Sequence, residues 1–261
     1  MFMKKILFCD MDGTIIENNL PIHHLDIEMI HELRKQGYYF AFCTGRNLEE
    51  AKIASHHFEY DFMVLNNGAM IVDQDDHVLY HKQIKNQDAK EILDYCMMHY
   101  PHLQYSFYNG QQTFNYYQGK TYVHNLQGTV ETKEYQFINE LNKMKDDFDI
   151  FCAFNPDETT NDILEIQDYI SRNYQDIQGT QNVIYLDVTV AHCSKGTGIQ
   201  ALCQILNEEL QTYCIGDSFN DQSMFKVADY AYTFNRVTDE IKKETDKQVD
   251  YVYEVIQDML K

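Results

Sequence analysis

Short apolar runs alternate with amphipathic segments through the first third of the chain. The runs Ile6–Cys9, Tyr38–Thr44 and Phe62–Asn66 are continuous, as is typical of strands buried in a parallel sheet. Between them, Leu25–Lys35 repeats apolar residues at broadly helical spacing, and Asn47 stands at the N-cap of a helix that reaches about His57. This strand–helix order predicts an α/β fold with a Rossmann-like, doubly wound parallel sheet.

The pattern changes character in the middle of the chain. Asn109-Gly110 lies between two aromatic-rich runs, QYSFY and TFNYY, and is a strong hairpin signal. Further predicted elements are helices at Ala89–Met98, about Tyr135–Lys145 and about Asp162–Ser171, and strands at FDIFCAF and NVIYLDVTV. We therefore expect an α+β cap domain, residues 82–187, inserted into the α/β core.

The α/β alternation returns after the insertion. The expected elements are a helix at Lys195–Leu206, a strand at TYCIG, a short helix at Asn220–Val227, a strand at Tyr230–Phe234 and helices near Asp239–Thr245 and Tyr253–Leu260. Residues 1–81 and 188–261 would then form one core domain.

Three polar clusters follow predicted core strands, where ligands bind in open parallel sheets, and a fourth, Ser194-Lys195-Gly196, stands where the C-terminal part of the core resumes. They are Asp10-Met11-Asp12-Gly13-Thr14, Thr44-Gly45-Arg46, Ser194-Lys195-Gly196 and Gly216-Asp217-Ser218-Phe219-Asn220-Asp221. Each cluster alone has an ordinary structural interpretation, such as a solvated turn, a surface lysine, or an ion pair of Arg46 with Glu49 or Glu50. Together, the clusters would converge at one edge of the sheet.

Their combined chemistry suits phosphoryl transfer. Asp10, Asp217 and Asp221 offer the hard oxygen ligands, or the support for them, that Mg²⁺ prefers. Lys195, the Thr44 hydroxyl and the backbone amides around Met11 and Gly45 would bind phosphate oxygens. One carboxylate can attack phosphorus, and a second, two residues on, can act as general acid and base.

The motifs DMDGT, the Thr of CTGR, the Lys of CSKGTG and GDSFND, in that order, resemble those of the haloacid dehalogenase (HAD) superfamily. LNNGA at residues 65–69 and the large insertion resemble the Cof-like branch with a C2-type (IIB) cap. The resemblance covers about residues 4–81 and 188–235. The chain departs from it at Asn235-Arg236, where relatives carry a glycine-rich turn.

The resemblance implies a role for each matching residue. Asp10 would be the nucleophile and a metal ligand, and Asp12 the general acid/base that also gives its carbonyl to the metal. Thr44, Lys195 and Asn220 would bind the phosphate, Asp217 would bind the metal, and Asp221 would support the metal or Lys195. Arg46 is a supporting candidate that could reach substrate.

These observations predict a magnesium-dependent phosphatase that acts on a small phosphomonoester, such as a sugar phosphate, through an aspartyl-phosphate intermediate. Two alternatives stay open: a phosphohexomutase of the phosphomannomutase type, and a regulator that binds a phosphorylated metabolite without turnover. Tyr-rich segments of the cap, including Tyr105 and Tyr116, could line a sugar pocket or pack the sheet.

Charge and cysteine content limit the partners. The formal charge of −20 argues against binding to nucleic acid or an anionic membrane. No apolar run approaches the roughly 20 residues of a membrane span. The seven scattered cysteines form no C-x-x-C pair, which favours free thiols in the cytoplasm. We expect a monomer or homodimer.

Overall fold

The computed structural model describes residues 3–16, 22–109, 113–117, 120–124, 130–135, 145–157, 159–182 and 184–261. The chain divides into two compact units, Met1–His81 with Cys193–Lys261, and Lys82–His192. The second unit ends five residues later than the predicted insertion. The reason is that strand β12 (Tyr185–Val190) pairs along its length with β11 (Ile177–Asn182), inside the sheet of the second unit.

The first unit contains an eight-stranded sheet in the order β15-β14-β13-β1-β2-β3-β4-β5. The pairs from β15 to β3 are parallel, whereas β3, β4 and β5 pair antiparallel. The strands are β1 (Lys4–Cys9), β2 (Tyr39–Cys43), β3 (Phe62–Leu65), β4 (Met70–Asp73), β5 (Val78–His81), β13 (Leu210–Ile215), β14 (Tyr230–Phe234) and β15 (Lys247–Val249). The predicted Rossmann-like parallel sheet is confirmed.

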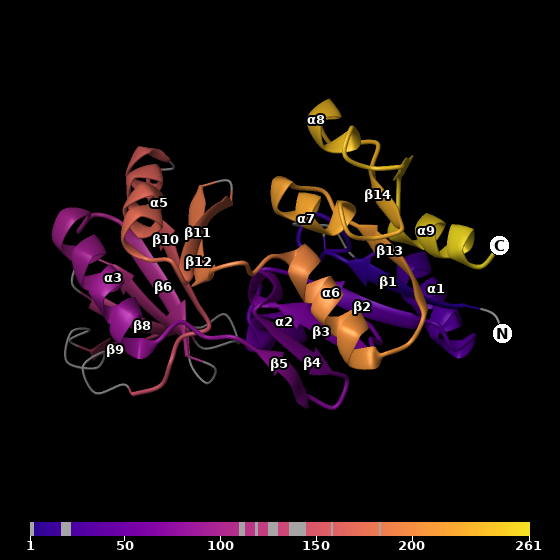
Figure 1. Cartoon of the computed structure of the whole chain (residues 1–261), viewed down its shortest axis with the longest axis horizontal. Coiled ribbons are helices and arrows are strands. Elements are labelled where there is room, and N and C mark those ends of the chain that lie inside the picture. The colour runs from indigo at the N-terminus through magenta and orange to yellow at the C-terminus, as the bar shows by residue number, and fades with distance from the viewer. Residues whose placement is uncertain are drawn as a thin grey trace. The chain divides into compact units, whose positions relative to one another are not determined.

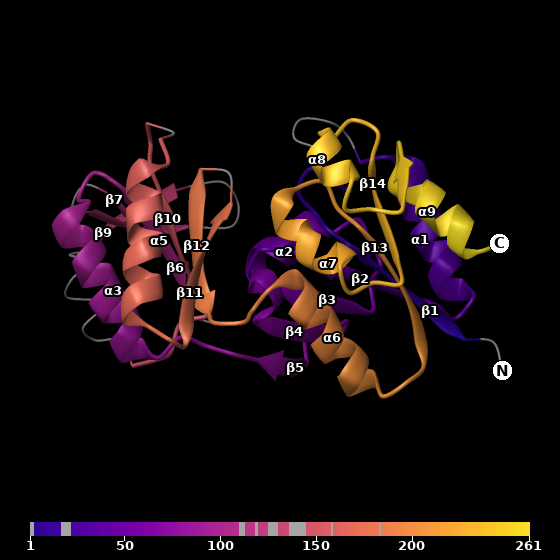
Figure 2. The same cartoon turned by 45° about the horizontal axis from the view of Figure 1, so that its top comes forward.

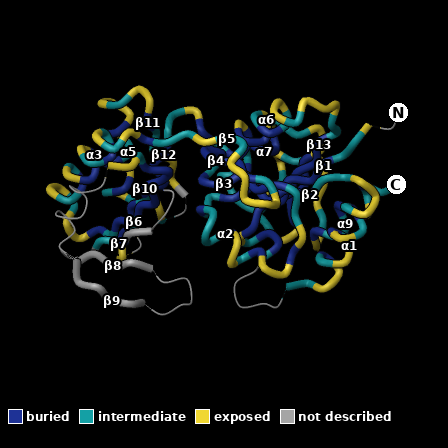
Figure 3. Tube along the Cα trace, turned by 90° about the horizontal axis from the view of Figure 1, so that it is seen from below, coloured by how far each residue is buried: buried dark blue, intermediate teal, exposed yellow. Residues whose placement is uncertain are grey.

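Helices cover both faces of this sheet (Figures 1 and 2). A hydrophobic core lies on each face of the sheet, and the side chains of β1 point alternately into one and the other. Leu7 and Cys9 pack with α1, α2 and α9, whereas Ile6 and Phe8 pack with α6, α7 and α8. The central strands are accordingly buried along most of their length (Figure 3). The helices are α1 (His24–Lys35), α2 (Leu48–Ala54), α6 (Lys195–Leu206), α7 (Gln222–Phe225), α8 (Asp239–Lys242) and α9 (Val252–Met259), with 3₁₀ turns η1 (Asn66–Gly68) and η2 (Phe219–Asp221).

The second unit is an antiparallel sheet in the order β11-β12-β10-β6-β7-β8-β9 with helices α3 and α5. The predicted pairing of the strands on either side of Asn109-Gly110 is confirmed, because β6 and β7 pair antiparallel, whereas residues 110–112 of the turn lie outside the described residues. The helix predicted near Tyr135–Lys145 falls mainly on residues 136–144, which lie outside the described residues. The other described elements of this unit are the strands β6 (Gln104–Tyr108), β7 (Thr113–Tyr117), β8 (Lys120–His124), β9 (Val130–Tyr135) and β10 (Ile150–Phe154) and the helices α3 (Asn86–His99) and α5 (Asn161–Asn173).

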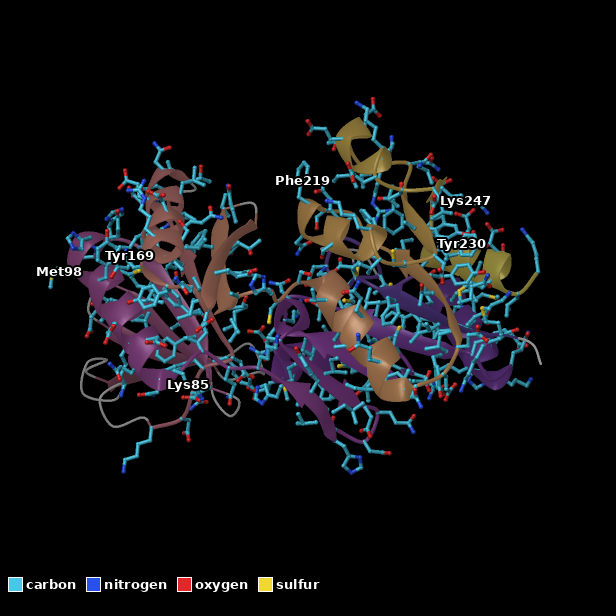
Figure 4. The ribbon with its side chains drawn as sticks, viewed as in Figure 1. Lys85, Met98, Tyr169, Phe219, Tyr230 and Lys247 are labelled. Atoms are coloured by element: carbon cyan, nitrogen blue, oxygen red, sulfur yellow. The ribbon has the colours of Figure 1, made fainter. Side chains whose placement is uncertain are left out.

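Aromatic residues pack the second unit. Tyr105 is fully buried, and its hydroxyl donates to the carbonyls of Cys96 and Tyr100. The ring of Tyr169 on α5, labelled in Figure 4, stacks on Tyr95 of α3 with centroids 3.5 Å apart. Tyr105 therefore belongs to the core of this unit rather than to a ligand pocket.

Among the described helices, none is long and apolar enough to cross a membrane. All seven cysteines are free, and five of them are buried.

The start of helix α6 approaches η1 so closely that two glycines are required. Gly68 has φ +92°, and a Cβ there would lie 2.1 Å from the Ser194 carbonyl oxygen. A Cβ on Gly198 would lie 2.4 Å from Val64 Cγ1. Because Lys195 is the first residue of α6, this contact fixes its position against the sheet.

We predict that Gly68→Ala destabilises the fold by about 1–3 kcal/mol more than Gly37→Ala, because it adds a steric clash. Gly37 is the matched control: its φ is +84°, and nothing lies within 4 Å of a Cβ built there. Both substitutions therefore carry the cost of a left-handed alanine, about 1–2 kcal/mol. Urea unfolding measures both variants, and equal losses would contradict the close approach.

Candidate active site

The loop after β1 carries the two aspartates of the DMDGT motif. Asp10 continues the β1–β13 ladder, since its amide donates to the Ile215 carbonyl at 3.0 Å. The chain then folds into a tight turn in which the Met11 carbonyl accepts from the amides of Thr14, Ile15 and Ile16. Gly13 has φ +78°, and a Cβ on it would lie 2.3 Å from Asp217 Oδ2, so the turn packs directly against that carboxylate.

Lys195 links two of the predicted site residues. Its ammonium donates to Asp10 Oδ1 and to Asp221 Oδ1, each at 2.6 Å. Lys195 is 1% exposed, Asp10 4% and Asp221 0%, so this is a buried charged cluster. Ser194 caps the helix in a capping box with Thr197, which sets the direction in which Lys195 leaves the backbone.

Asp221 organises the loop that follows β13. Its Oδ2 accepts from the amides of Asp217 and Ser218, each at 2.9 Å, and from the Ser218 hydroxyl. A Cβ on Gly216 would lie 2.4 Å from Asp221 Cγ, so the carboxylate fills the space beside that glycine. Phe219, in contrast, is 58% exposed and points outward from the same loop (Figure 4).

Asp10, Asp217 and Asp221 bring one carboxylate oxygen each within 4.8 Å of one another. Burial raises the pKa of Asp10 to about 7, with Lys195 opposing the shift and Asp221 and Asp217 adding to it. Burial, with Asp221, likewise raises the pKa of Asp217 to about 6. Burial acts to lower the pKa of Lys195, but Asp10 and Asp221 raise it above its ordinary value. The three carboxylates together therefore offer more negative charge than the single Lys195 ammonium can balance.

Thr44 and Arg46 follow β2 at the same edge of the sheet. Thr44 is 1% exposed, and its hydroxyl accepts from the Arg46 amide at 3.1 Å. The Arg46 guanidinium forms a two-pronged ion pair with Asp12, Nε to Oδ2 at 2.7 Å and Nη2 to Oδ1 at 2.6 Å. It meets Glu50 only at that residue's carbonyl oxygen, at 3.5 Å, rather than in the ion pair considered from the sequence.

The remaining predicted site residues lie on the same loops. Met11 is fully buried and contributes its backbone to the turn after β1. Gly45 is close to Asn67, whose side-chain oxygen would lie 3.2 Å from a Cβ on that glycine. The Asn220 side chain accepts from the Ser218 hydroxyl at 2.5 Å, a contact within its own loop and not one with Lys195 or Thr44.

Sequence reasoning missed two contacts to the acidic loops. The Thr14 hydroxyl donates to Asp217 Oδ1 at 3.3 Å, and Arg236 donates to the Gly13 carbonyl at 2.6 Å. Thr14 belongs to the DMDGT motif, so its position two residues after Asp12 was the available signal. Arg236 is part of the departure after β14, and no local pattern connects it with Gly13, which is 223 residues away.

Comparison with known proteins identifies the family. The family model for haloacid dehalogenase-like hydrolases matches residues 7–255. A putative phosphatase of Buchnera aphidicola subsp. Baizongia pistaciae is 24% identical over 233 residues, covering 87% of this chain and 84% of that protein.

Solved structures agree in fold. A HAD-superfamily phosphatase from Bacteroides thetaiotaomicron matches with a TM-score of 0.76 at 18% identity, over 98% of this chain and 95% of that one. A subclass IIB sugar phosphatase of the superfamily matches with a TM-score of 0.75 at 19% identity, over 98% of this chain and 99% of that one. The resemblance seen in the motifs is confirmed, and the chain belongs to the haloacid dehalogenase-like hydrolase family.

Proposed function

We propose that this hydrolase is a magnesium-dependent phosphatase that removes the phosphoryl group from a small phosphomonoester. The observation that carries the proposal is the buried Lys195, bonded to both Asp10 and Asp221 beside the Asp217 carboxylate. A buried ammonium and several carboxylates in one place are suited to binding and attacking a phosphoryl group.

The site fits a divalent cation. Burial leaves the carboxyls of Asp10 and Asp217 with raised pKa values, so the site lacks positive charge. An all-oxygen donor set is the kind that Mg²⁺ prefers. Asp10, Asp217 and the Asp12 carbonyl would hold the ion, which when bound supplies positive charge to the phosphoryl oxygens.

Asp10 is the nucleophile in this proposal. Its carboxylate oxygen attacks phosphorus, the bond from phosphorus to the ester oxygen breaks, and an aspartyl phosphate forms. Asp12 gives a proton to the departing alcohol and then takes one from the water that attacks the aspartyl phosphate. Cleavage of that second bond releases phosphate and restores Asp10.

Other residues bind the phosphoryl group and support the charged cluster. Lys195 and the Thr44 hydroxyl donate to phosphate oxygens, with Asn220 and the backbone amides near Met11 and Gly45. We assign Asp221 to the support of Lys195, because its oxygens already accept from Lys195 and from the backbone of its own loop.

A sugar phosphate or related metabolite is the proposed substrate class, supported by the fold that the chain shares with a sugar phosphatase. The second unit, as a cap, would choose among such substrates. Free thiols at all seven cysteines fit a cytoplasmic enzyme.

We expect Asp10→Asn to lower phosphate release from 4-nitrophenyl phosphate by more than about 10³-fold, because the amide is a poor nucleophile. Asp239→Asn is the control, since that side chain is 90% exposed, and it should keep wild-type activity. Activity retained by Asp10→Asn would remove Asp10 as nucleophile. A wild-type protein that converts a hexose phosphate to its isomer without releasing phosphate would be a mutase.

Metal and pH should act together on stability. In the metal-free folded chain, burial raises the pKa of Asp217 to about 6, whereas the ordinary value is 3.8. The folded chain therefore binds more protons than the unfolded chain within that window, and the stability contributed by Asp217 falls as pH rises from about 4 to 6. We expect Mg²⁺ to raise the melting temperature more at pH 8 than at pH 5.

Thermal unfolding with and without Mg²⁺ measures this difference, with Asp217→Asn as a variant that should lose most of the gain. EDTA should abolish phosphate release and Mg²⁺ should restore it. Full activity in EDTA, or an equal gain at both pH values, would contradict the metal assignment.

A further inference from the structure

The two-pronged ion pair between Arg46 and Asp12 lies at the exposed side of the charged cluster. Both Asp12 oxygens accept from the guanidinium, at 2.6 and 2.7 Å. This fork geometry fixes the direction of a carboxylate as well as attracting it. The proposed function uses Asp12 for proton transfer but gives Arg46 no role.

Contacts from three directions fix Arg46. Its amide donates to the Thr44 hydroxyl at 3.1 Å, and its carbonyl accepts from the Asn66 amide at 3.0 Å. Its guanidinium also reaches the Glu50 carbonyl on α2. The end of β2, the turn η1 and helix α2 therefore all hold this residue.

The backbone of Asp12 is equally constrained. Asp12 forms a bridge with Ile16, and the Gly13 amide donates to the Ile16 carbonyl at 2.9 Å. Both ends of the ion pair thus start from fixed backbone. Reaction geometry that rests on residues held in this way needs little reorganisation.

Stability does not account for the pair. The side chains of Arg46 and Asp12 are 31% and 52% exposed. Ion pairs at such exposed positions contribute little to stability, because solvent screens the two charges. A comparable fork joins Arg34 to Asp61, where the side chains are only 21% and 18% exposed. That fork lies toward the start of β2, because Asp61 also accepts from the Phe40 amide.

We propose that Arg46 is a positioning residue that aims the Asp12 carboxylate at the water that hydrolyses the aspartyl phosphate. The inference rests on the proposed function. A carboxylate has about four lone-pair sites, and the fork takes two of them, so two remain to accept a proton. In this step water forms a bond to phosphorus, its proton passes to Asp12, and the bond from phosphorus to Asp10 breaks.

The test uses the Mg²⁺-loaded enzyme and 4-nitrophenyl phosphate, whose leaving group departs without needing a proton. The first half-reaction then depends little on Asp12, and kcat/KM reports that half alone. For Arg46→Ala we expect kcat to fall about 10–100-fold, because a misdirected Asp12 would lose part of the rate acceleration that general base catalysis supplies. KM should fall in proportion, kcat/KM should stay within about twofold, and rapid mixing should show a burst of one 4-nitrophenolate per site.

A double-mutant cycle separates action through Asp12 from direct contact with substrate. Asp12→Asn should itself lower kcat, and adding Arg46→Ala to it should change kcat less than about twofold. Arg46→Lys keeps the charge without the fork and should recover only part of the loss. If Arg46→Ala fails to fold, as judged by circular dichroism, Arg46→Gln takes its place in the same cycle.

Arg34→Ala is the matched control, because it removes a similar fork away from the proposed site and should leave kcat unchanged within about twofold. A fall in kcat/KM for Arg46→Ala, repeated in the Asp12→Asn background, would mean that Arg46 binds substrate and would overturn the proposal. An unchanged kcat would overturn it too. Neither result touches the phosphatase assignment, which fails only if the wild-type enzyme releases no phosphate.

Discussion

A lysine ammonium buried between two carboxylates is the interaction on which the rest of the site depends. Taking Lys195, Asp10 and Asp221 out of water costs several kcal/mol per ion, and only close, well-directed pairing offsets that cost. Removal of one member would leave an uncompensated buried charge. The surrounding backbone therefore has to hold all three groups to within tenths of an ångström.

Glycines and backbone hydrogen bonds provide that precision. Gly68 and Gly198 let α6 approach η1, so that Lys195 starts from a fixed place, and Gly13 lets the turn after β1 lie against Asp217. One carboxylate oxygen of Asp221 accepts from Lys195, and the other accepts from the amides of its own loop. The same residues that shape the loops thus also set the charge balance of the site.

Much of the core was predictable because burial on both faces of a parallel sheet produces continuous apolar runs. Helix α6 and strand β14 begin and end where the pattern predicts. The short strands β5 and β15 were not predicted, because the exposed residues of Val78–His81 and Lys247–Val249 carry no such signal. Strand β11, Ile177–Asn182, is polar and glycine-containing, so only its pairing with β12 identifies it. In the site, the positions of the polar clusters along the sequence suggested which residues lie together at one edge of the sheet. The partner of Arg46, in contrast, depends on the direction in which its side chain points. Local sequence favoured Glu49 or Glu50, whereas the fold presents Asp12.

The parallel pairing of β1 with β13 has a consequence for biosynthesis. The bond from Lys195 to Asp10 spans 185 positions, and β1 lies between β2 and β13 in the finished sheet. As the chain leaves the ribosome, β2 is available early, whereas β13 appears only after the whole of Lys82–His192 has been made. One edge of the apolar strand β1 therefore stays unpaired until β13 has been made. The charged cluster of Asp10, Lys195 and Asp221 can consequently be assembled only after Asp221 has been added to the chain.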